Sequence, residues 1–447
     1  MFSAYLLTNA ATILIFGKLS DIYGRKPIFV IGVFIFLLGS TLCGFSTSMV
    51  MLIISRFIQG IGAGALMPIA TTIVGDIYTK HERAKIQGYL SSVWGISAIS
   101  GPLLGGLFVD ILNWRYVFWM NIPLGLLAML GIIIFLKEDI NQEKPHIDYA
   151  GSLWIVIAIT TMMFILVEGG VSLAWTSPIM YGLLAVAGVT LGLFIYQQFR
   201  VPDPMMPFEI WKYRIILTAN LASLVAGMIV IGVSSYLPAF VQGVMGYSAT
   251  IAGFTMTAMS IGWPIASTIA GRVLLKIGYR STCMIGGGFL ILGGTLFLLL
   301  TPDKGPLWAT MASFFIGAGM GLTSTSFIVG IQSSVGWGIR GIATAANMFM
   351  RSLGSALGAA FFGGLLNKGI LRHIEQEGWG DVLTVDSTNL LLDPERKISL
   401  PKEAVNVLQV GLTNGLQIVY TGFLFLAIAV FIMVLFMPKK EEEENAS

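Results

Sequence analysis

Charged side chains inside long apolar stretches are the residues best placed to do chemistry in this sequence, because a charge in lipid is costly and normally faces a cavity or a partner. Arg56 lies about seven residues, roughly 10 Å, from the nearer end of its apolar stretch, and Arg351 lies about eleven residues inside another. Asp76, Asp110 and Glu168 lie close to the ends of such stretches, where solvation of the charge is the favoured interpretation. The apolar interior therefore holds two cations and no acid, whereas proton coupling there generally needs a carboxylate or a histidine.

Asp21 is the one acidic residue of a short basic segment, residues 17–27, that separates two apolar stretches. Gly24 permits a tight turn, and the basic pair that follows it can hold this turn in the cytoplasm, which is a purely topological interpretation. A carboxylate at a membrane surface can also bind the positive end of a nearby helix. The apolar stretch that begins near Gly341 starts at the same face, so Asp21 is predicted to cap that helix.

The composition places most of the chain in lipid. Of its 447 residues, 55% are hydrophobic and 11% are charged, whereas about 25% of the residues of a soluble protein are charged. A net charge of +3 gives no reason to expect nucleic acid as a partner. The three histidines fall in separate loops, and Cys43 and Cys283 lie near opposite membrane faces. We therefore expect no metal site, no cofactor, no disulfide and no enzymatic activity.

Apolar runs of about 20 residues, the length that spans a bilayer, can be read between charged or Pro/Gly-rich breaks. Thirteen are predicted, each a helix because lipid leaves no water to satisfy an open backbone. Their approximate limits are 1–16, 28–46, 49–76, 85–111, 115–136, 149–168, 178–197, 214–242, 248–275, 281–300, 307–330, 340–366 and 412–437. Loops rich in Lys and Arg alternate with loops that are poor in them, and the rich set is assigned to the cytoplasm.

The first predicted span raises a problem of length. Sixteen helical residues extend only about 24 Å, which is less than the hydrocarbon thickness of about 30 Å. Three further observations point to an incomplete first bundle. The number of spans is odd, Arg56 has no acidic partner, and no titratable group lies at mid-depth. We expect an N-terminally shortened chain, whose complete form has one more helix with the carboxylate that proton coupling needs. The alternative is a natural thirteen-helix protein.

Two parts of the sequence repeat each other. Residues 17–26 match residues 271–280 in their glycines and cations, with Leu275 in place of Asp21. The glycines of residues 60–64 match those of residues 317–321 at a nearly equal offset. Two related helical bundles with a cargo site between them are a common transporter plan. The predicted parts are a first bundle, a pair of inserted transmembrane helices, a second bundle with a long external loop (367–411), and an acidic cytoplasmic tail, with limits 1–136, 137–212, 213–437 and 438–447.

Four segments resemble motifs of the major facilitator superfamily. Residues 17–27 are similar to its loop motif, and residues 56–64 are similar to its fourth-helix motif. Residues 95–106 resemble the fifth-helix motif of its antiporters, and residues 114–123 resemble a motif of its fourteen-span drug:proton antiporters. The resemblance covers essentially the whole chain. It implies an all-α transmembrane fold of two six-helix bundles, the first lacking the family's first helix, with two inserted linking helices.

The resemblance also implies roles for particular residues. A latch between the two bundles on the cytoplasmic side is expected at Gly17, Asp21, Gly24, Arg25 and Lys26. A bent helix that accompanies export is expected at Gly95, Gly101, Pro102, Gly105 and Gly106, although each glycine can also serve only close packing. Arg56 is expected to face the interior of the first bundle and to support the proton site through its charge.

Mid-depth polar and aromatic residues of the expected inward-facing helices are candidates for the cargo cavity, and simple packing is the competing interpretation. They are Asn9, Gln59, Trp94, Trp263, Asn347, Met348 and Arg351. A flexible aromatic lining suits lipophilic cations. The function expected is export of small amphipathic or cationic drugs in exchange for protons, by a monomer in the bacterial plasma membrane. Uptake or symport of a metabolite and a receptor without transport are the alternatives.

Overall fold

The computed structural model describes residues 2–138, 148–169, 173–380, 382–392 and 401–439. Most of the predicted acidic tail and part of the predicted external loop thus lie outside the described residues. Within them the fold is helical and contains no β-strand. The transmembrane all-α fold expected from the apolar runs is confirmed.

In the described part of the chain, thirteen α-helices and four short helical turns make up this fold. The first eight α-helices are α1 (Phe2–Tyr23), α2 (Arg25–Gly44), α3 (Met49–Ile77), α4 (Lys80–Ile111), α5 (Tyr116–Trp119), α6 (Asn121–Phe135), α7 (Tyr149–Glu168) and α8 (Pro178–Gln198). The others are α9 (Arg214–Ala239), α10 (Ala249–Leu298), α11 (Gly305–Ser334), α12 (Trp337–Gln376) and α14 (Lys402–Leu435). The short turns are η1 (Phe208–Lys212), η2 (Phe240–Val244), η3 (Pro302–Lys304) and η4 (Val385–Leu392).

Every predicted span coincides with helix, but the number that qualifies by composition differs from the prediction. Among the described residues, ten helices are long and apolar enough to cross a membrane. Helix α10 counts once although it contains two predicted spans, which meet at Gly278, a residue with non-helical backbone angles. Helices α1 and α4 also coincide with predicted spans and are not among the ten.

The predicted end of the first span is wrong. Helix α1 continues through Gly17 to Tyr23, and its 22 residues extend about 33 Å, which is enough for the hydrocarbon layer. The segment interpreted as a loop therefore forms the last turns of a helix. The chain breaks instead at Gly24, where φ is 92°, a backbone angle that glycine adopts without a steric penalty.

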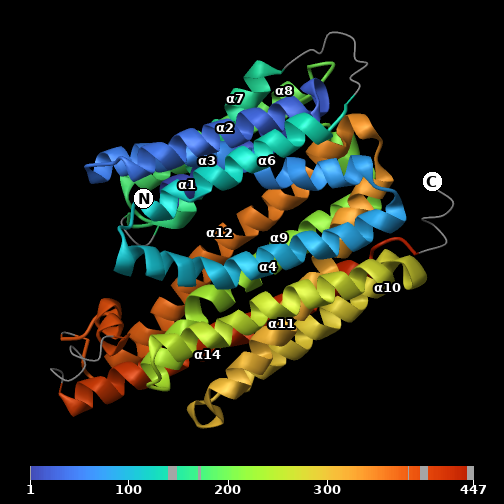
Figure 1. The fold of residues 1–447 in the computed structure, drawn as a ribbon. Helices are drawn as coiled ribbons and strands as arrows, with labels where there is room; N and C mark the ends of the chain where they lie inside the picture. The colour runs from blue at the N-terminus through green and yellow to red at the C-terminus, as the bar shows by residue number, and fades with distance from the viewer. Residues whose placement is uncertain (1, 139–147, 170–172, 381, 393–400, 440–447) are drawn as a thin grey trace.

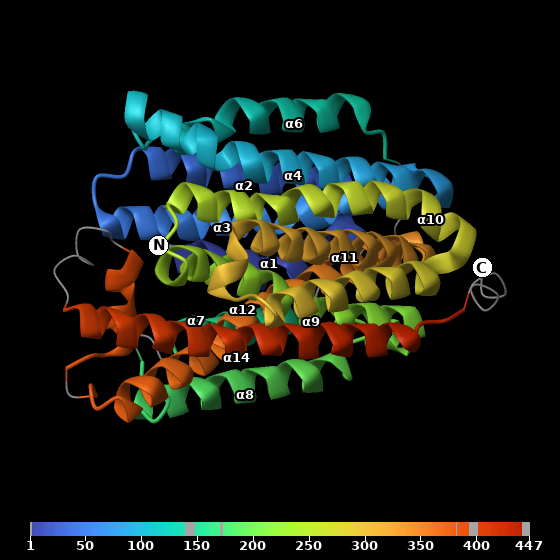
Figure 2. The ribbon, with the colours of Figure 1, turned by 90° about the horizontal axis from the view of Figure 1, so that it is seen from below.

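Figure 1 shows α1, α2, α3 and α6 gathered on one side of the molecule and α10, α11 and α14 on the other, with α4, α9 and α12 between them. We call α1–α6 the N-terminal helices and α9–α14 the C-terminal helices. Figure 2 shows the helices running side by side, with α6 and α8 at opposite edges. Helix α7 packs on α8 and also contacts α1 and α12.

The sequence repeat reappears in the packing. Gly24 and Gly278 are matching positions, and both have positive φ with extended ψ. Gly60 and Gly64 of α3 lie against α1, whereas Gly62 lies against α2. In α11 the first and last glycines of residues 317–321 lie against the first part of α10, and the middle one lies against its second part. Small residues thus allow equivalent helices to approach closely in both sets.

Candidate functional site

Asp21 joins the N-terminal and C-terminal helices at the end assigned to the cytoplasm. Its carboxylate oxygens accept hydrogen bonds from the backbone N–H groups of Gly341 and Ile342, both at 2.8 Å. The side chain is 1% exposed. The predicted contact with this helix is present, but α12 begins one turn earlier, at Trp337, so Asp21 binds the start of its second turn.

Arg25 is buried beside Asp21, which a cation with a purely topological role would not be. Its Nη1 lies 2.5 Å from Asp21 Oδ1, and its Nε donates to Asp76 Oδ2 at 2.9 Å. Its Nη2 donates to the carbonyl of Trp337 at 2.8 Å, and the guanidinium lies 4.6 Å from the centroid of that indole. Arg25 therefore binds both sets of helices, and it is 1% exposed.

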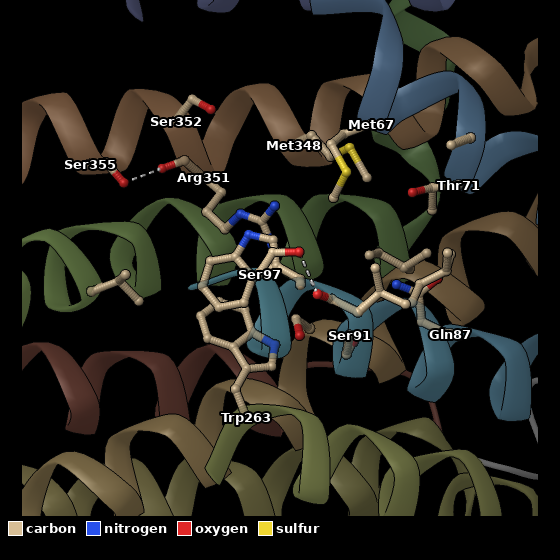
Figure 3. Close-up of a pocket in the computed structure, with 17 residues that line it drawn as sticks. Met67, Thr71, Gln87, Ser91, Ser97, Trp263, Met348, Arg351, Ser352 and Ser355 are labelled. Carbon is tan, nitrogen blue, oxygen red and sulfur yellow. Dashed lines mark hydrogen bonds between the residues drawn. The ribbon is translucent and has the colours of Figure 1, made fainter. Parts of the chain in front are cut away.

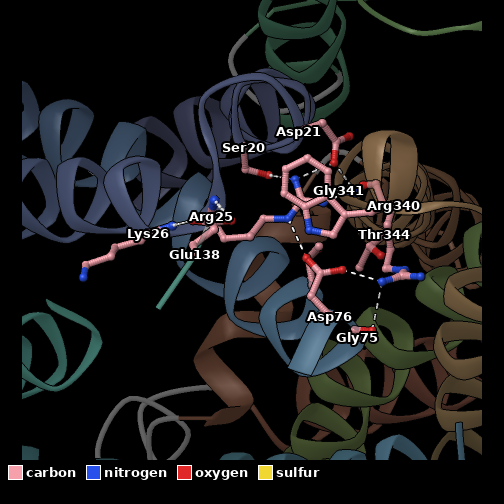
Figure 4. A network of polar contacts seen from close by, with 12 residues as sticks. Ser20, Asp21, Arg25, Lys26, Gly75, Asp76, Glu138, Arg340, Gly341 and Thr344 are labelled. Atoms are coloured by element: carbon pink, nitrogen blue, oxygen red, sulfur yellow. Dashed lines mark hydrogen bonds and ion pairs between the residues drawn. The ribbon is translucent and has the colours of Figure 1, made fainter. Parts of the chain in front are cut away.

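Asp76 completes the network drawn in Figure 4, because its second oxygen forms an ion pair with Arg340 of α12. Arg340 also donates to the carbonyl of Gly75 at 3.0 Å. Sequence reasoning missed this role and favoured a solvated Asp76. The available indication was its position at the cytoplasmic end of α3, the end where the basic loops gather.

Lys26, which is also drawn in Figure 4, bonds to the N-terminal part of the chain. Its Nζ donates to the carbonyls of Ile133 and Leu136 at the end of α6, and its backbone N–H donates to Glu138. These partners all belong to the N-terminal part of the chain. The structure thus separates the basic pair: Arg25 joins the two sets of helices, whereas Lys26 closes the end of a neighbouring helix.

Further contacts close the same end. Gln332 of α11 donates to the carbonyl of Thr71 in α3 at 3.0 Å, and Arg83 of α4 donates to the carbonyl of Gln332 at 3.4 Å. Gly17 lies against α12 so closely that a Cβ there would collide with Ala345. The hydrogen bonds that join the N-terminal to the C-terminal helices thus gather at the cytoplasmic end.

A cavity of about 380 Å³ lies between the two sets of helices. Its lining comes from α3, α4, α9, α10, α11 and α12. The residues are Met67, Ala70, Thr71, Gln87, Leu90, Ser91, Val93, Trp94, Ser97, Val230, Trp263, Ser324, Ile328, Met348, Arg351, Ser352 and Ser355. Figure 3 shows Arg351 and Trp263 reaching from opposite sides into this space. The lining is mostly apolar and also contains hydroxyl groups and the amide of Gln87. Among the described residues, Arg351 is its one charged side chain.

The comparisons with known proteins agree with this arrangement. The model of the Major Facilitator Superfamily matches residues 1–359. The chain belongs to the Major Facilitator Superfamily. It is 32% identical over 452 residues to Multidrug resistance protein 3 of Bacillus subtilis (strain 168), a match that covers 99% of this chain and 88% of that protein. It is also 32% identical over 472 residues to Multidrug transporter protein MdtP of the same strain, covering 99% of this chain and 87% of that protein.

A solved structure shares the fold. The crystal structure of the human organic anion transporter MFSD10 superposes with a TM-score of 0.62 at 14% sequence identity, over 97% of this chain and 82% of that one. At this identity the likeness concerns the fold alone. The chain is therefore a multi-pass membrane protein with the fold of major facilitator transporters.

Within this superfamily fold, four of the predicted cavity residues line the cavity: Trp94, Trp263, Met348 and Arg351. The other three do not line it. Gln59 donates to Ser40 and accepts from Arg56, and Asn347 donates to Ser223 at 2.9 Å and to Asn220 at 3.1 Å. Asn9 lies on α1 beside α3, where its carbonyl approaches Gly64. The polar groups of Gln59 and Asn347 are bonded inside one set of helices and do not face the cargo space.

Arg56 points among the N-terminal helices. Its Nη1 donates to Gln59 Oε1 at 3.0 Å, and its guanidinium lies 4.7 Å from the ring centroid of Phe118 and 5.6 Å from that of Tyr5. Its Nε is buried and has no hydrogen-bond partner among the described residues. This position fits the expected inward orientation, and the effect of Arg56 on a proton site stays a prediction.

The predicted bent helix is α4. Gly95 lies in close contact with Pro264 and with the carbonyl of Ser260 in α10, whereas no described atom lies within 4 Å of a Cβ built at Gly101 or Gly105. The side chains of Pro102 and Gly106 lie outside the described part of the chain, so the bend at that position stays a prediction. At Gly101 and Gly105, therefore, α4 has no close contact with the described atoms of α10, whereas it has one at Gly95.

Proposed function

We propose that the protein exports small amphipathic molecules, drugs among them, by alternating access across a bacterial plasma membrane. The observation that carries the proposal is the cavity between the two sets of helices, which polar contacts close on the cytoplasmic side. The names of the relatives in Bacillus subtilis support drug export as the direction and class of transport. One chain contains the whole cavity, so we expect a monomer to be active.

The cytoplasmic network gives this proposal a mechanism. It holds α1, α2 and α3 against α12. We propose that these contacts block the path of the cargo from the cavity to the cytoplasm. Loading requires these bonds to break, and water then solvates the exposed charges. A hydrogen bond to a charged group contributes about 1.5–3 kcal/mol. The network therefore favours the cytoplasm-closed state, in which cargo leaves to the outside.

Inward proton movement is the driving force that we propose. Among the described residues, no acid lines the cavity. The carboxylates whose surroundings change when the cytoplasmic end opens are those of Asp21 and Asp76, because both bind across the two sets of helices. We therefore assign proton linkage to this network.

Dye efflux from cells that lack their own pumps tests the proposal. Cells that express the protein should lose a panel of amphipathic dyes faster than cells with an empty vector, and a protonophore should abolish the difference. Efflux that resists the protonophore would reject the proton linkage and leave export standing. Faster accumulation of the dyes would reverse the proposed direction, and no difference with any dye would reject drug export.

A further inference from the structure

Arg351 carries the charge of the cavity. The other polar side chains that line it are neutral hydroxyls, the amide Gln87 and two indoles. Among the described residues, no acidic side chain lines the cavity, and none forms an ion pair with Arg351. From this we infer that the cargo is an organic anion, whose negative group binds Arg351 and whose aromatic part binds the tryptophans.

The charge balance of the cavity supports this choice. A guanidinium in a largely apolar space lacks the water that would solvate it, so a ligand that supplies a carboxylate or sulfonate stabilises it. A planar guanidinium can bind either group through two parallel hydrogen bonds. A cationic ligand would meet a like charge, and no carboxylate among the described lining residues offsets the repulsion. The lining therefore selects against the lipophilic cations that its aromatic residues alone would suit.

The position of Arg351 is fixed by packing. Ser355 Oγ lies within hydrogen-bond distance of the carbonyl of Arg351, at 3.2 Å, and of the carbonyl of Gly227 in α9, at 3.3 Å. A Cβ at Gly227 would collide with the carbonyl of Arg351, so α9 and α12 touch through their backbones at this level. The guanidinium thus extends from a rigid part of the structure, which lowers the entropy lost on binding a ligand.

The aromatic part of the site joins the two sets of helices. Trp94 of α4 and Trp263 of α10 have ring centroids 5.1 Å apart and planes inclined by 48°. Met67 of α3 and Met348 of α12 add flexible apolar surface to the same cavity. Figure 3 shows the Trp263 ring facing the side from which Arg351 enters. The cavity can therefore hold a molecule with an anionic group near an aromatic ring.

This inference rests on the proposed export function and adds the charge of the cargo to it. It also sets the electrical character of transport. Export of a monoanion in exchange for one proton moves net positive charge inward, so an inside-negative potential accelerates it. Export of a monocation for one proton moves no net charge. The response to membrane potential thus reports the sign of the cargo independently of any variant.

Fluorescein and rhodamine 123 are suitable probes, since they share a xanthene ring system and differ in charge. Their transport would be measured with the purified full chain in liposomes, under an imposed proton gradient with and without a potassium diffusion potential. We expect fluorescein to be transported at least about tenfold faster than rhodamine 123, because a charged hydrogen bond corresponds to about a tenfold or larger change in affinity. Fluorescein transport should also rise when the compartment that releases it is made negative.

Three variants separate binding from folding. Arg351→Gln should lower the rate of fluorescein transport about tenfold or more. The rate of rhodamine 123 transport should stay the same or rise. Arg351→Lys keeps the charge and should retain most of the fluorescein transport. Lys402→Gln removes a cation from the exposed surface and should change the transport rate of neither dye. Equal losses for both dyes in Arg351→Gln would show that Arg351 supports the structure, and the inference would be wrong.

The remaining outcomes are also decisive. Transport of rhodamine 123 in preference to fluorescein would overturn the inference while export stands. If neither dye is transported, the proposed function fails for these probes, and calorimetric titration of the purified protein with fluorescein decides the inference. Binding that Arg351→Gln weakens about tenfold would support an anion site. Absence of binding, or binding that the variant leaves unchanged, would overturn it.

Discussion

Two contacts between the sets of helices, α1 with α12 and α10 with α4, are related by the internal repeat and differ in their chemistry. Gly17 lies against Ala345 and Gly341 in the first, and Gly271 lies against Ala84 in the second. We call the first contact, together with Arg25 of α2 and Asp76 of α3 beside it, the charged interface. The second contact, together with Tyr279 of α10 and Ser333 of α11 beside it, is the neutral interface. Both depend on small residues at matching positions, so the repeat preserves the close approach of the helices.

Uncharged residues stand in the second half at the positions that match the charged residues of the first half. Asp21 corresponds to Leu275, Arg25 to Tyr279, and Asp76 to Ser333. The ion pair between Arg25 and Asp76 at 2.9 Å thus becomes a hydrogen bond from Tyr279 to Ser333 at 3.3 Å. The close approach of the helices is alike at the two interfaces, so backbone geometry alone does not distinguish them. The comparison teaches that, among the described residues, only the charged interface contains buried ion pairs, and the desolvation of these charges makes its opening strongly dependent on their partners.

Asp76→Ala should give the largest effect, because it removes the carboxylate that pairs with both Arg25 and Arg340. Removing one partner of a buried ion pair costs about 3–5 kcal/mol. We expect a lower unfolding temperature in detergent and loss of dye efflux. Ser333→Ala is the matched control at the neutral interface and should be mild. Equal destabilisation by the two variants would contradict the distinction between the interfaces.

Asp21→Asn should have the next largest effect. The amide keeps the size of the side chain but loses the charge that binds Arg25 and the two backbone N–H groups of α12. A loss of about 1.5–3 kcal/mol should shift the protein toward the cytoplasm-open state and lower efflux tenfold or more at normal expression. Labelling of a cysteine placed at the cytoplasmic end should rise in parallel. If Asp21→Asn has normal efflux while Gly24→Leu loses it, residues 17–27 act only as a turn and do not hold the cytoplasmic end closed.

Glycine substitutions test what the two interfaces share. Gly17→Ala brings a Cβ against Ala345, and Gly271→Ala brings one against the carbonyl of Ala84. Each should destabilise the cytoplasm-closed state by about 1–3 kcal/mol, measured by the same labelling. Ala345→Gly should rescue Gly17→Ala, because the obstructing atom belongs to a side chain. A large effect at only one of the two glycines would show that the repeat does not preserve the function of this contact.

The sequence predicts the helices well, since lipid demands long apolar runs, and it predicts the contact of Asp21 because an acid in a basic segment needs a positive partner. It does not predict the role of Asp76. A carboxylate near the end of a span looks the same whether it faces water or, as here, an arginine 264 residues away in the chain. Hydropathy also leaves the rotation of a buried helix undetermined, which is why Gln59 was assigned to the cavity although it bonds within the N-terminal helices. The end of α1 was misplaced because its last turns carry charged residues, which a hydropathy reading assigns to a loop.

Tyr279→Phe should give the smallest effect and sets the scale of the neutral interface. The variant keeps the buried ring, which is 3% exposed, and removes only the hydroxyl that donates to Ser333 at 3.3 Å. A neutral hydrogen bond near the upper limit of distance contributes about 0.5 kcal/mol, so efflux should change by about twofold or less. Tyr279 is neutral, so unlike Asp21→Asn the variant removes no charge, and labelling of the introduced cysteine should stay close to that of the unmodified protein. A tenfold loss of efflux in Tyr279→Phe would show that the neutral interface also controls opening, and the contrast between the two interfaces would then not be one of charge.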